Sequence, residues 1–379
     1  MMHDSEQSES PILAMKSLNK AEGTAAEAME RRGDAKRNAL QATTRQTRSW
    51  ESVSPGLERV RESARTNPKL RFTSLLHHIT PELLRMAYYS LKRKAAPGID
   101  GVTWDAYGED LERKLNELHG RIHRGAYRAL PSRRRMIPKP DGRERPLGIA
   151  SLEDKIVQRA VVEVLNAIYE ADFLGFSYGF RPKRSQHDAL DALAFAIEKK
   201  KVNWILDADL RSYFDTVNHE WLLRFLEVRI GDRRIIRLIR KWLKAGVMED
   251  GITSATVVGT PQGAVASPLL SNIYLHYSFD LWANRWRRRS TRGDVIFIRY
   301  ADDYVAGFQY EDDAKAFLEE LGHRLEHFGL SLIQTRRALS NLGDTPPKDV
   351  PNADCVNRKR SRFSVLLISA GRTNSVASF

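Results

Sequence analysis

The sequence predicts an α+β fold in which short strands lie among amphipathic helices. Residues 133–151 and 295–308 each have the pattern of a β-hairpin. Residues 203–218 begin as an apolar strand and continue as a helix. Residues 154–173 and 311–332 carry apolar residues at helical spacing. Hairpins and helices mixed in this way are typical of the α+β class.

Two further helices are expected in the same part of the chain. Residues 75–95 should be helical, with Thr80 as N-cap and Pro81 in the first turn. Residues 219–246 have the pattern of a single, very basic helix.

The composition favours a polyanionic partner. The chain has 379 residues, 42% of them hydrophobic, and a formal net charge of +13, so it is long enough for two or three domains with a sizeable core. A positive excess of this size suits phosphate binding, although a soluble protein with a basic face would have the same charge.

The single cysteine and the hydropathy exclude other classes. Cys355 has no partner for a disulfide within the chain or for a cysteine zinc site, which fits a cytoplasmic location. No apolar run approaches the roughly 20 residues that span a bilayer, and the first residues lack a secretory pattern. Nothing in the sequence points to a membrane, and the oligomeric state stays open.

The chain divides into three parts by composition. Residues 1–66 are basic, polar and poor in large apolar residues, so we expect a helical or disordered arm that either contacts RNA or has no role. Residues 67–332 contain the predicted elements, and residues 333–379 form a tail.

The hairpin at 295–308 carries two adjacent acids. Asp302 and Asp303 follow Tyr300-Ala301, with apolar strand formers on both sides. Aspartate is common in surface turns, but no glycine or proline marks this one. Adjacent carboxylates between apolar strands are costly unless cations offset their charge, which favours a metal site.

A second acidic cluster ends the strand at 203–209. Asp209 follows Trp204-Ile205-Leu206, with Asp207 and Asp215 nearby in sequence. Carboxylates from separate strands provide the hard oxygen ligands that Mg²⁺ prefers. Two such ions about 3.5–4 Å apart can activate a 3′-hydroxyl and stabilise a leaving pyrophosphate.

Six ordered segments resemble the reverse transcriptase family, and most closely its group II intron branch. They read PGIDGVTWDAY, RRRMIPKPDGRERPLGIASLEDKIVQRAV, SYGFRPKRSQHDAL, LDADLRSYFDTVNHEWLL, GTPQGAVASPLLSNIYLH and RYADDYVAGF, and they cover roughly residues 85–332. A lone YADD would be a weak signal, whereas six blocks in the family's order are very specific.

The resemblance implies a right-hand polymerase fold with fingers and an antiparallel palm sheet flanked by helices. It implies that Asp209, Asp302 and Asp303 are catalytic and bind two Mg²⁺ ions. The implied partners are an intron RNA template, a DNA primer and deoxynucleoside triphosphates. Asp215 matches a neighbouring acid that we interpret as structural.

The resemblance also suggests a nucleotide-binding set. Phe214 matches the bulky residue that excludes a 2′-hydroxyl, or it is simply part of the core. Gln262 and Gly263 match the loop beside the incoming nucleotide and the template. Lys139 and Arg145 in the first hairpin could bind the triphosphate or attract the template more generally.

Two further arginines match an RNA-contacting segment. Arg181 and Arg184 should organise the fingers or line the RNA path. Asp100 looks structural, and the ten histidines show no metal-ligand spacing.

The tail departs from the family. The block His-Pro-x-Lys-Thr-Arg-Leu-Ile and the helical thumb that follow in relatives are absent after Leu332. Codons for Ile333–Leu342 can encode that block when read in a neighbouring frame with one C restored, and Asn357–Leu367 permits a later family segment under the same shift. We therefore expect residues 333–379 to be a frameshifted, disordered replacement for a missing or scrambled thumb, against the alternative of an unrelated tail.

The sequence predicts an RNA-directed DNA polymerase whose maturase role is impaired by truncation. One rival is an RNA-binding splicing cofactor with an idle polymerase centre, and another is a non-functional remnant. The intact acidic triad argues against idleness.

Overall fold

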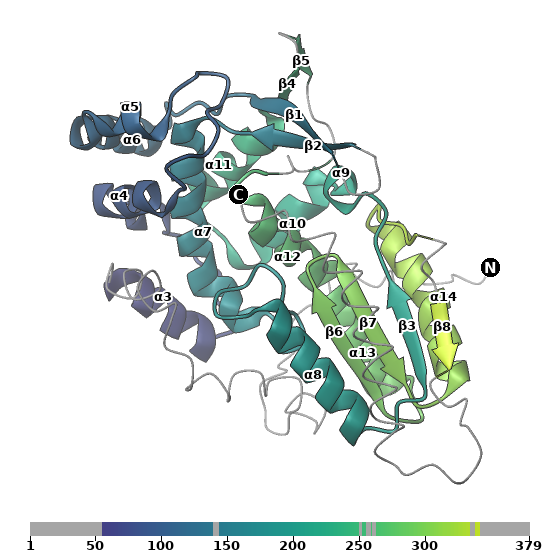
Figure 1. Cartoon of the computed structure of the whole chain (residues 1–379). Helices are drawn as coiled ribbons and strands as arrows, with labels where there is room; N and C mark the ends of the chain where they lie inside the picture. The colour runs from purple at the N-terminus through teal and green to yellow at the C-terminus, as the bar shows by residue number, and fades with distance from the viewer. Residues whose placement is uncertain are drawn as a thin grey trace, which may run out of the picture.

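Two small sheets organise the chain (Figure 1). The structure is a computed structural model that describes residues 55–138, 144–249, 252–254, 259, 263–333 and 338–341. The finger sheet has the order β2-β1-β4-β5, with β1 Ser132–Pro138, β2 Glu144–Ile149, β4 Val247–Glu249 and β5 Ile252–Ser254. The palm sheet has the order β6-β7-β3-β8, with β3 Trp204–Ala208, β6 Val295–Tyr300, β7 Asp303–Phe308 and β8 Ala338–Asn341.

Helices surround both sheets within the described residues. They are α3 Pro55–Thr66, the 3₁₀ turn Leu76–His78, α4 Pro81–Ser90, α5 Trp104–Gly108, α6 Leu111–His123, α7 Leu152–Asp172, α8 Gln186–Lys199, α9 Tyr213–Thr216, α10 His219–Arg229, α11 Arg233–Lys244, α12 Ser267–Leu275, the π-helical segment His276–Asp280, α13 Leu281–Arg289 and α14 Glu311–His327. The mixed α+β class is therefore as the sequence predicted.

Side chains alternate between the two faces of the palm sheet along each strand. Because successive residues of these strands are apolar, both faces of the sheet are apolar. Ile205, Ile296 and Ile298 pack with α8 in one core cluster. Phe297 and Phe308 lie in the main core, where their rings contact Phe317 of α14 at centroid distances of 5.2 and 5.4 Å. The sheet is thus packed between α8 on one side and α14 on the other.

Helix α7 is the spine of the N-terminal half. It begins at the N-cap Ser151, whose side chain accepts a hydrogen bond from the Asp154 amide, and most of its faces are buried. Helices α3 and α4 both pack against it (Figure 1). Since Val60 and Ala64 of α3 lie in the main core, the folded body includes residues from 55 onward, and the boundary predicted at residue 67 is too late.

Both predicted hairpins are confirmed. Strand β1 pairs antiparallel with β2, from Arg133 opposite Ile149 to Pro138 opposite Glu144. Strand β6 pairs with β7, and Tyr300 lies opposite Asp303. Thr80 caps α4 through the Leu83 amide, as expected.

The basic helix predicted at 219–246 is instead two helices. The chain leaves helical geometry between α10 and α11, where Asp232 caps α11 by accepting from the Arg234 amide. The same carboxylate accepts hydrogen bonds from the amides of Leu75 and Leu76 at 2.8 and 3.0 Å. These distant donors stabilise the break, and no local pattern reveals them.

Part of the tail is ordered against the palm. Strand β8 pairs antiparallel with β3, from Trp204 opposite Asn341 to Asp207 opposite Ala338. The expectation of a disordered tail therefore fails for residues 338–341, because backbone pairing can complete a sheet edge whatever the side chains are. Residues 334–337 and 342–379, with Cys355, lie outside the described residues.

Among the described helices, none is long and apolar enough to cross a bilayer.

We predict that His276 makes the fold acid-sensitive. Burial, together with the positive charges of Arg299 and Arg181, lowers the pKa of its imidazole from 6.5 to about 3. Below pH 6.5 the unfolded chain then binds a proton that the folded chain does not, so stability falls as pH falls towards 3. The loss should reach about 2 kcal/mol at pH 5.

The measurement is the free energy of unfolding at several pH values. In His276→Met the component between pH 6.5 and 3 should disappear, whereas His187→Gln, at an exposed position, should retain it. An unchanged pH dependence in His276→Met would contradict this origin.

Candidate active site

The backbone brings the three predicted acids to one end of the palm sheet. In the β3–β7 pair, Ala208 lies opposite Tyr304, so Asp209 follows at the position facing Asp303. Asp302 occupies the turn between β6 and β7. The amide of Ile333 donates to the Asp209 carbonyl at 2.9 Å and fixes the end of β3.

The turn that carries Asp302 is held from below by Arg299. This guanidinium is 1% exposed and donates both to Asp280, at 2.7 and 2.6 Å, and to the Asn272 side chain at 3.0 Å. It also donates to the Ser177 hydroxyl at 2.7 Å and to the carbonyl of Ala301 at 2.8 Å. All five guanidinium N–H groups are thereby used, and one of them fixes the turn itself.

The same turn rests on the backbone of Gly179. Ala301 has a φ of +57°, a conformation uncommon for a residue with a side chain. A Cβ on Gly179 would lie 2.2 Å from the Ala301 nitrogen, so only glycine permits this approach. The Asn272 amide donates to the Gly179 carbonyl at 2.7 Å. The strained turn is therefore fixed by contacts with two other parts of the chain.

The donor set of this end suits Mg²⁺, because three carboxylates on adjacent backbone positions offer hard oxygen ligands. In the described part of the chain, however, no three acidic, histidine or cysteine side chains are gathered tightly enough to hold a metal. Close convergence of Asp209, Asp302 and Asp303 stays a prediction for the metal-bound protein.

Phe214 lies at the start of the short helix that follows β3. Its ring is half-buried, 5.5 Å from the Tyr213 ring, and packs at the edge of the core. Gly259 lies against it, since a Cβ there would be 3.0 Å from the Phe214 carbonyl oxygen. The position allows both predicted roles, a part of the core and a wall beside a nucleotide.

The segment that resumes at Gly263 contacts the finger hairpin. Gly263 has a φ of +100°, and a Cβ there would lie 2.8 Å from the Leu147 side chain of β2. Gln262 and Lys139 lie outside the described residues, as does the side chain of Arg145, whose backbone pairs with Ile137. The fold thus connects the regions of Phe214, Gly263 and the hairpin.

Arg181 does not have the position of an RNA ligand. Its side chain is 4% exposed and forms an ion pair with Glu170 at 2.9 Å. It also donates to the carbonyls of Leu174 and Ser177 at 2.9 and 2.7 Å. Direct RNA binding by Arg181 is therefore corrected in favour of the other expectation, that it organises the fold.

Arg184 also anchors this segment, although its side chain is partly exposed. It donates to the Gly175 carbonyl at 2.5 Å and lies over the Tyr178 ring at 4.9 Å. These contacts favour an organising role for Arg184 as well.

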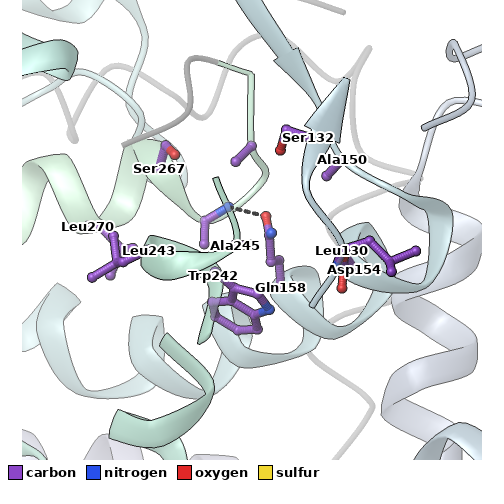
Figure 2. Close-up of a pocket in the computed structure, with 12 residues that line it drawn as sticks. Leu130, Ser132, Ala150, Asp154, Gln158, Trp242, Leu243, Ala245, Ser267 and Leu270 are labelled. Carbon is purple, nitrogen blue, oxygen red and sulfur yellow. Dashed lines mark hydrogen bonds between the residues drawn. The ribbon is translucent and has the colours of Figure 1, made fainter. Parts of the chain in front are cut away.

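A small pocket lies beneath the loop that contains Gly263. Gln158 of α7 accepts a hydrogen bond from the Ala266 amide at 3.2 Å. Ser267, Trp242 and Asp154 also line the pocket (Figure 2). Burial raises the pKa of Asp154, against hydrogen bonds from Tyr127 and Ser151 that lower it. The residues that line this pocket come from β1, α7, α11 and α12 and from segments beside these elements. The hydrogen bond from Ala266 to Gln158 thus connects α7 to the residue before α12.

The sequence interpretation missed the residues that support the site, namely Arg299, Asp280, Asn272 and Gln158. One signal was available, because Arg299 is a charged residue that directly follows the apolar residues 295–298 in strand β6. A charge in a buried strand requires a buried partner. The identity of that partner, 19 residues away, could not be read from the pattern.

Comparisons with known proteins agree with this arrangement. Residues 137–339 match the family model described as reverse transcriptase (RNA-dependent DNA polymerase). The chain is 40% identical over 275 residues to Protein YkfC of Escherichia coli (strain K12), which covers 64% of this chain and 72% of YkfC. It is 37% identical over 225 residues to Group II intron-encoded protein LtrA of Lactococcus lactis subsp. cremoris, covering 58% of this chain.

The match spans only 37% of the length of LtrA. A third relative, an uncharacterized 91 kDa protein in the cob intron of Schizosaccharomyces pombe, is 37% identical over 198 residues. That match spans 24% of the relative's length. The family match extends over more than half of the chain and includes both acidic clusters. This protein therefore belongs to the reverse transcriptase family, and the relatives that it resembles include group II intron-encoded proteins.

Proposed function

We propose that this protein is an RNA-directed DNA polymerase of the group II intron type. It adds deoxynucleotides to the 3′-hydroxyl of a primer, as directed by an intron RNA template. The observation that carries the proposal is the supported turn, which sets Asp302 and Asp303 beside the end of β3 and Asp209. Primer extension by the purified chain on an RNA template tests it.

The reaction joins the primer 3′-oxygen to the α-phosphorus of the nucleotide and releases pyrophosphate. Asp209, Asp302 and Asp303 would hold two Mg²⁺ ions, which supply charge stabilisation for the hydroxyl and the leaving group. Phe214 would border the sugar, and Arg299 keeps the turn in place. The basic finger hairpin, with Lys139 and Arg145, would hold the triphosphate.

A basic face supports RNA binding. On α11 the apolar residues are buried, and the exposed side carries Arg233, Arg234, Arg237, Arg240 and Lys244. The chain runs from α11 directly into β4, which pairs with β1, where Arg134 and Arg135 are exposed. Exposed basic residues therefore occur both on α11 and on the finger strand β1.

The same face favours a second candidate function, an intron RNA-binding splicing cofactor. LtrA is by its name encoded in a group II intron. An RNA-binding chain that never extends a primer, in wild-type form with Mg²⁺, would favour this candidate over the polymerase.

We predict that Asp302→Asn abolishes primer extension and leaves RNA affinity nearly intact. The substitution removes a negative charge needed by the metal ions, and a loss of at least ~100-fold is expected. The control is Asp312→Asn, the same chemical change at a side chain that is 81% exposed on α14. Primer extension by Asp302→Asn at the wild-type rate would show that Asp302 is not a catalytic residue.

We predict that Phe214 controls sugar choice. Phe214→Ala opens space where a 2′-hydroxyl would otherwise clash, so the ratio of ribonucleotide to deoxyribonucleotide incorporation should rise by about tenfold or more. Phe214→Tyr keeps the ring and should keep the ratio. An unchanged ratio in an active, folded Phe214→Ala protein would mean that Phe214 serves only the core.

We predict that RNA binding weakens steeply with salt. If roughly 6–10 phosphates are contacted, affinity should fall by about 10³–10⁵ between about 50 and 200 mM salt. Arg237→Gln with Arg240→Gln should reduce the slope of log affinity against log salt by about one per lost contact. The matched pair Arg288→Gln with Arg289→Gln, exposed on α13, should leave it unchanged; equal effects would place the RNA elsewhere.

A further inference from the structure

Phe180 combines two features that the core does not explain. Its side chain is exposed, at 36%, and its backbone has a φ of +58°. A bulky residue in the left-handed region is strained, and such strain often marks a functional position. Glycine would remove both the strain and the exposed ring.

The segment around Phe180 is firmly anchored. Its neighbours Gly179 and Arg181 are buried, the first against the turn at Ala301 and the second by Glu170. The Tyr178 amide donates to the Arg299 carbonyl at 2.8 Å, which ties the segment to β6. The Phe180 ring is therefore presented from a rigid base immediately beside the turn that carries Asp302.

A cation accompanies the ring on the same loop. Lys183 is exposed, and it also has a left-handed backbone, with a φ of +61°. An exposed aromatic ring beside a basic residue is a common arrangement in nucleic-acid sites, where the ring contacts bases or sugars and the cation contacts phosphate.

We propose that the Phe180 ring packs against the sugars and bases of the primer–template beside the catalytic turn. This inference rests on the proposed polymerase function and adds a substrate-binding residue to it. The ring supplies an apolar contact that releases no counterions, and Lys183 supplies an adjacent phosphate contact. The two contributions therefore differ in their dependence on salt.

The test is the affinity for a fluorescently labelled DNA primer annealed to RNA, measured by anisotropy over a range of salt. Phe180→Gly should bind about fivefold more weakly or worse at every salt concentration, with an unchanged slope. Lys183→Gly relieves similar backbone strain and should reduce the slope by about one. Phe180→Tyr should restore the affinity.

Stability separates this role from a structural one. Phe180→Gly should melt at or above the wild-type temperature, because glycine adopts the left-handed region without strain. The control Tyr310→Gly removes an aromatic ring that is 43% exposed beyond the far end of β7, and it should bind as wild type. Wild-type binding by Phe180→Gly, a lowered melting temperature, or an equal loss in Tyr310→Gly would overturn the proposal.

Primer extension by the wild-type protein is measured in parallel. A wild type that binds the primer–template but never extends it would refute the polymerase function, while the affinity of Phe180→Gly would still decide the contact. Under the proposal, Phe180→Gly raises the KM for primer–template more than it lowers kcat, and an effect confined to kcat would contradict a binding contact.

Discussion

The buried charge of Arg299 is the constraint on which the candidate site depends. A guanidinium removed from water is costly unless every donor is satisfied and an opposite charge lies nearby. Asp280 provides the charge, and Asn272, Ser177 and the Ala301 carbonyl accept the remaining hydrogen bonds. The chain can satisfy Arg299 only when the α12 helix, the Ser177 segment and the β6–β7 turn are all in place.

This constraint explains how an acidic turn survives in a folded protein. Adjacent carboxylates repel, and the left-handed Ala301 adds strain. Strands β6 and β7 pack between two apolar clusters, and contacts from Arg299 and Gly179 hold the turn in place. Rigid support of this kind keeps a site close to the geometry that its ligands require.

Local patterns predicted the elements, and distant contacts decided the details. The alternation in 295–308 and the cap at Thr80 act through neighbours in sequence, so they could be read directly. The break before α11 is stabilised by Asp232, which accepts hydrogen bonds from the amides of Leu75 and Leu76, the first of them 157 residues away. Likewise, the sequence left direct RNA binding open for Arg181, because the sequence does not show that Glu170 forms an ion pair with it. The three acids were predicted from the family's motifs. The residues that hold the turn beneath them, such as Arg299 and Asp280, were not predicted.

The proposed function requires divalent cations where β3 meets the β6–β7 turn, and localised cleavage tests this requirement most directly. Fe²⁺ bound in place of Mg²⁺, with ascorbate and peroxide, cuts the backbone near the ion. We expect cuts close to Asp209 and to Asp302–Asp303, suppressed by excess Mg²⁺ and lost in Asp209→Asn. Cuts elsewhere in the chain, or cuts that persist unchanged in Asp209→Asn, would contradict the account.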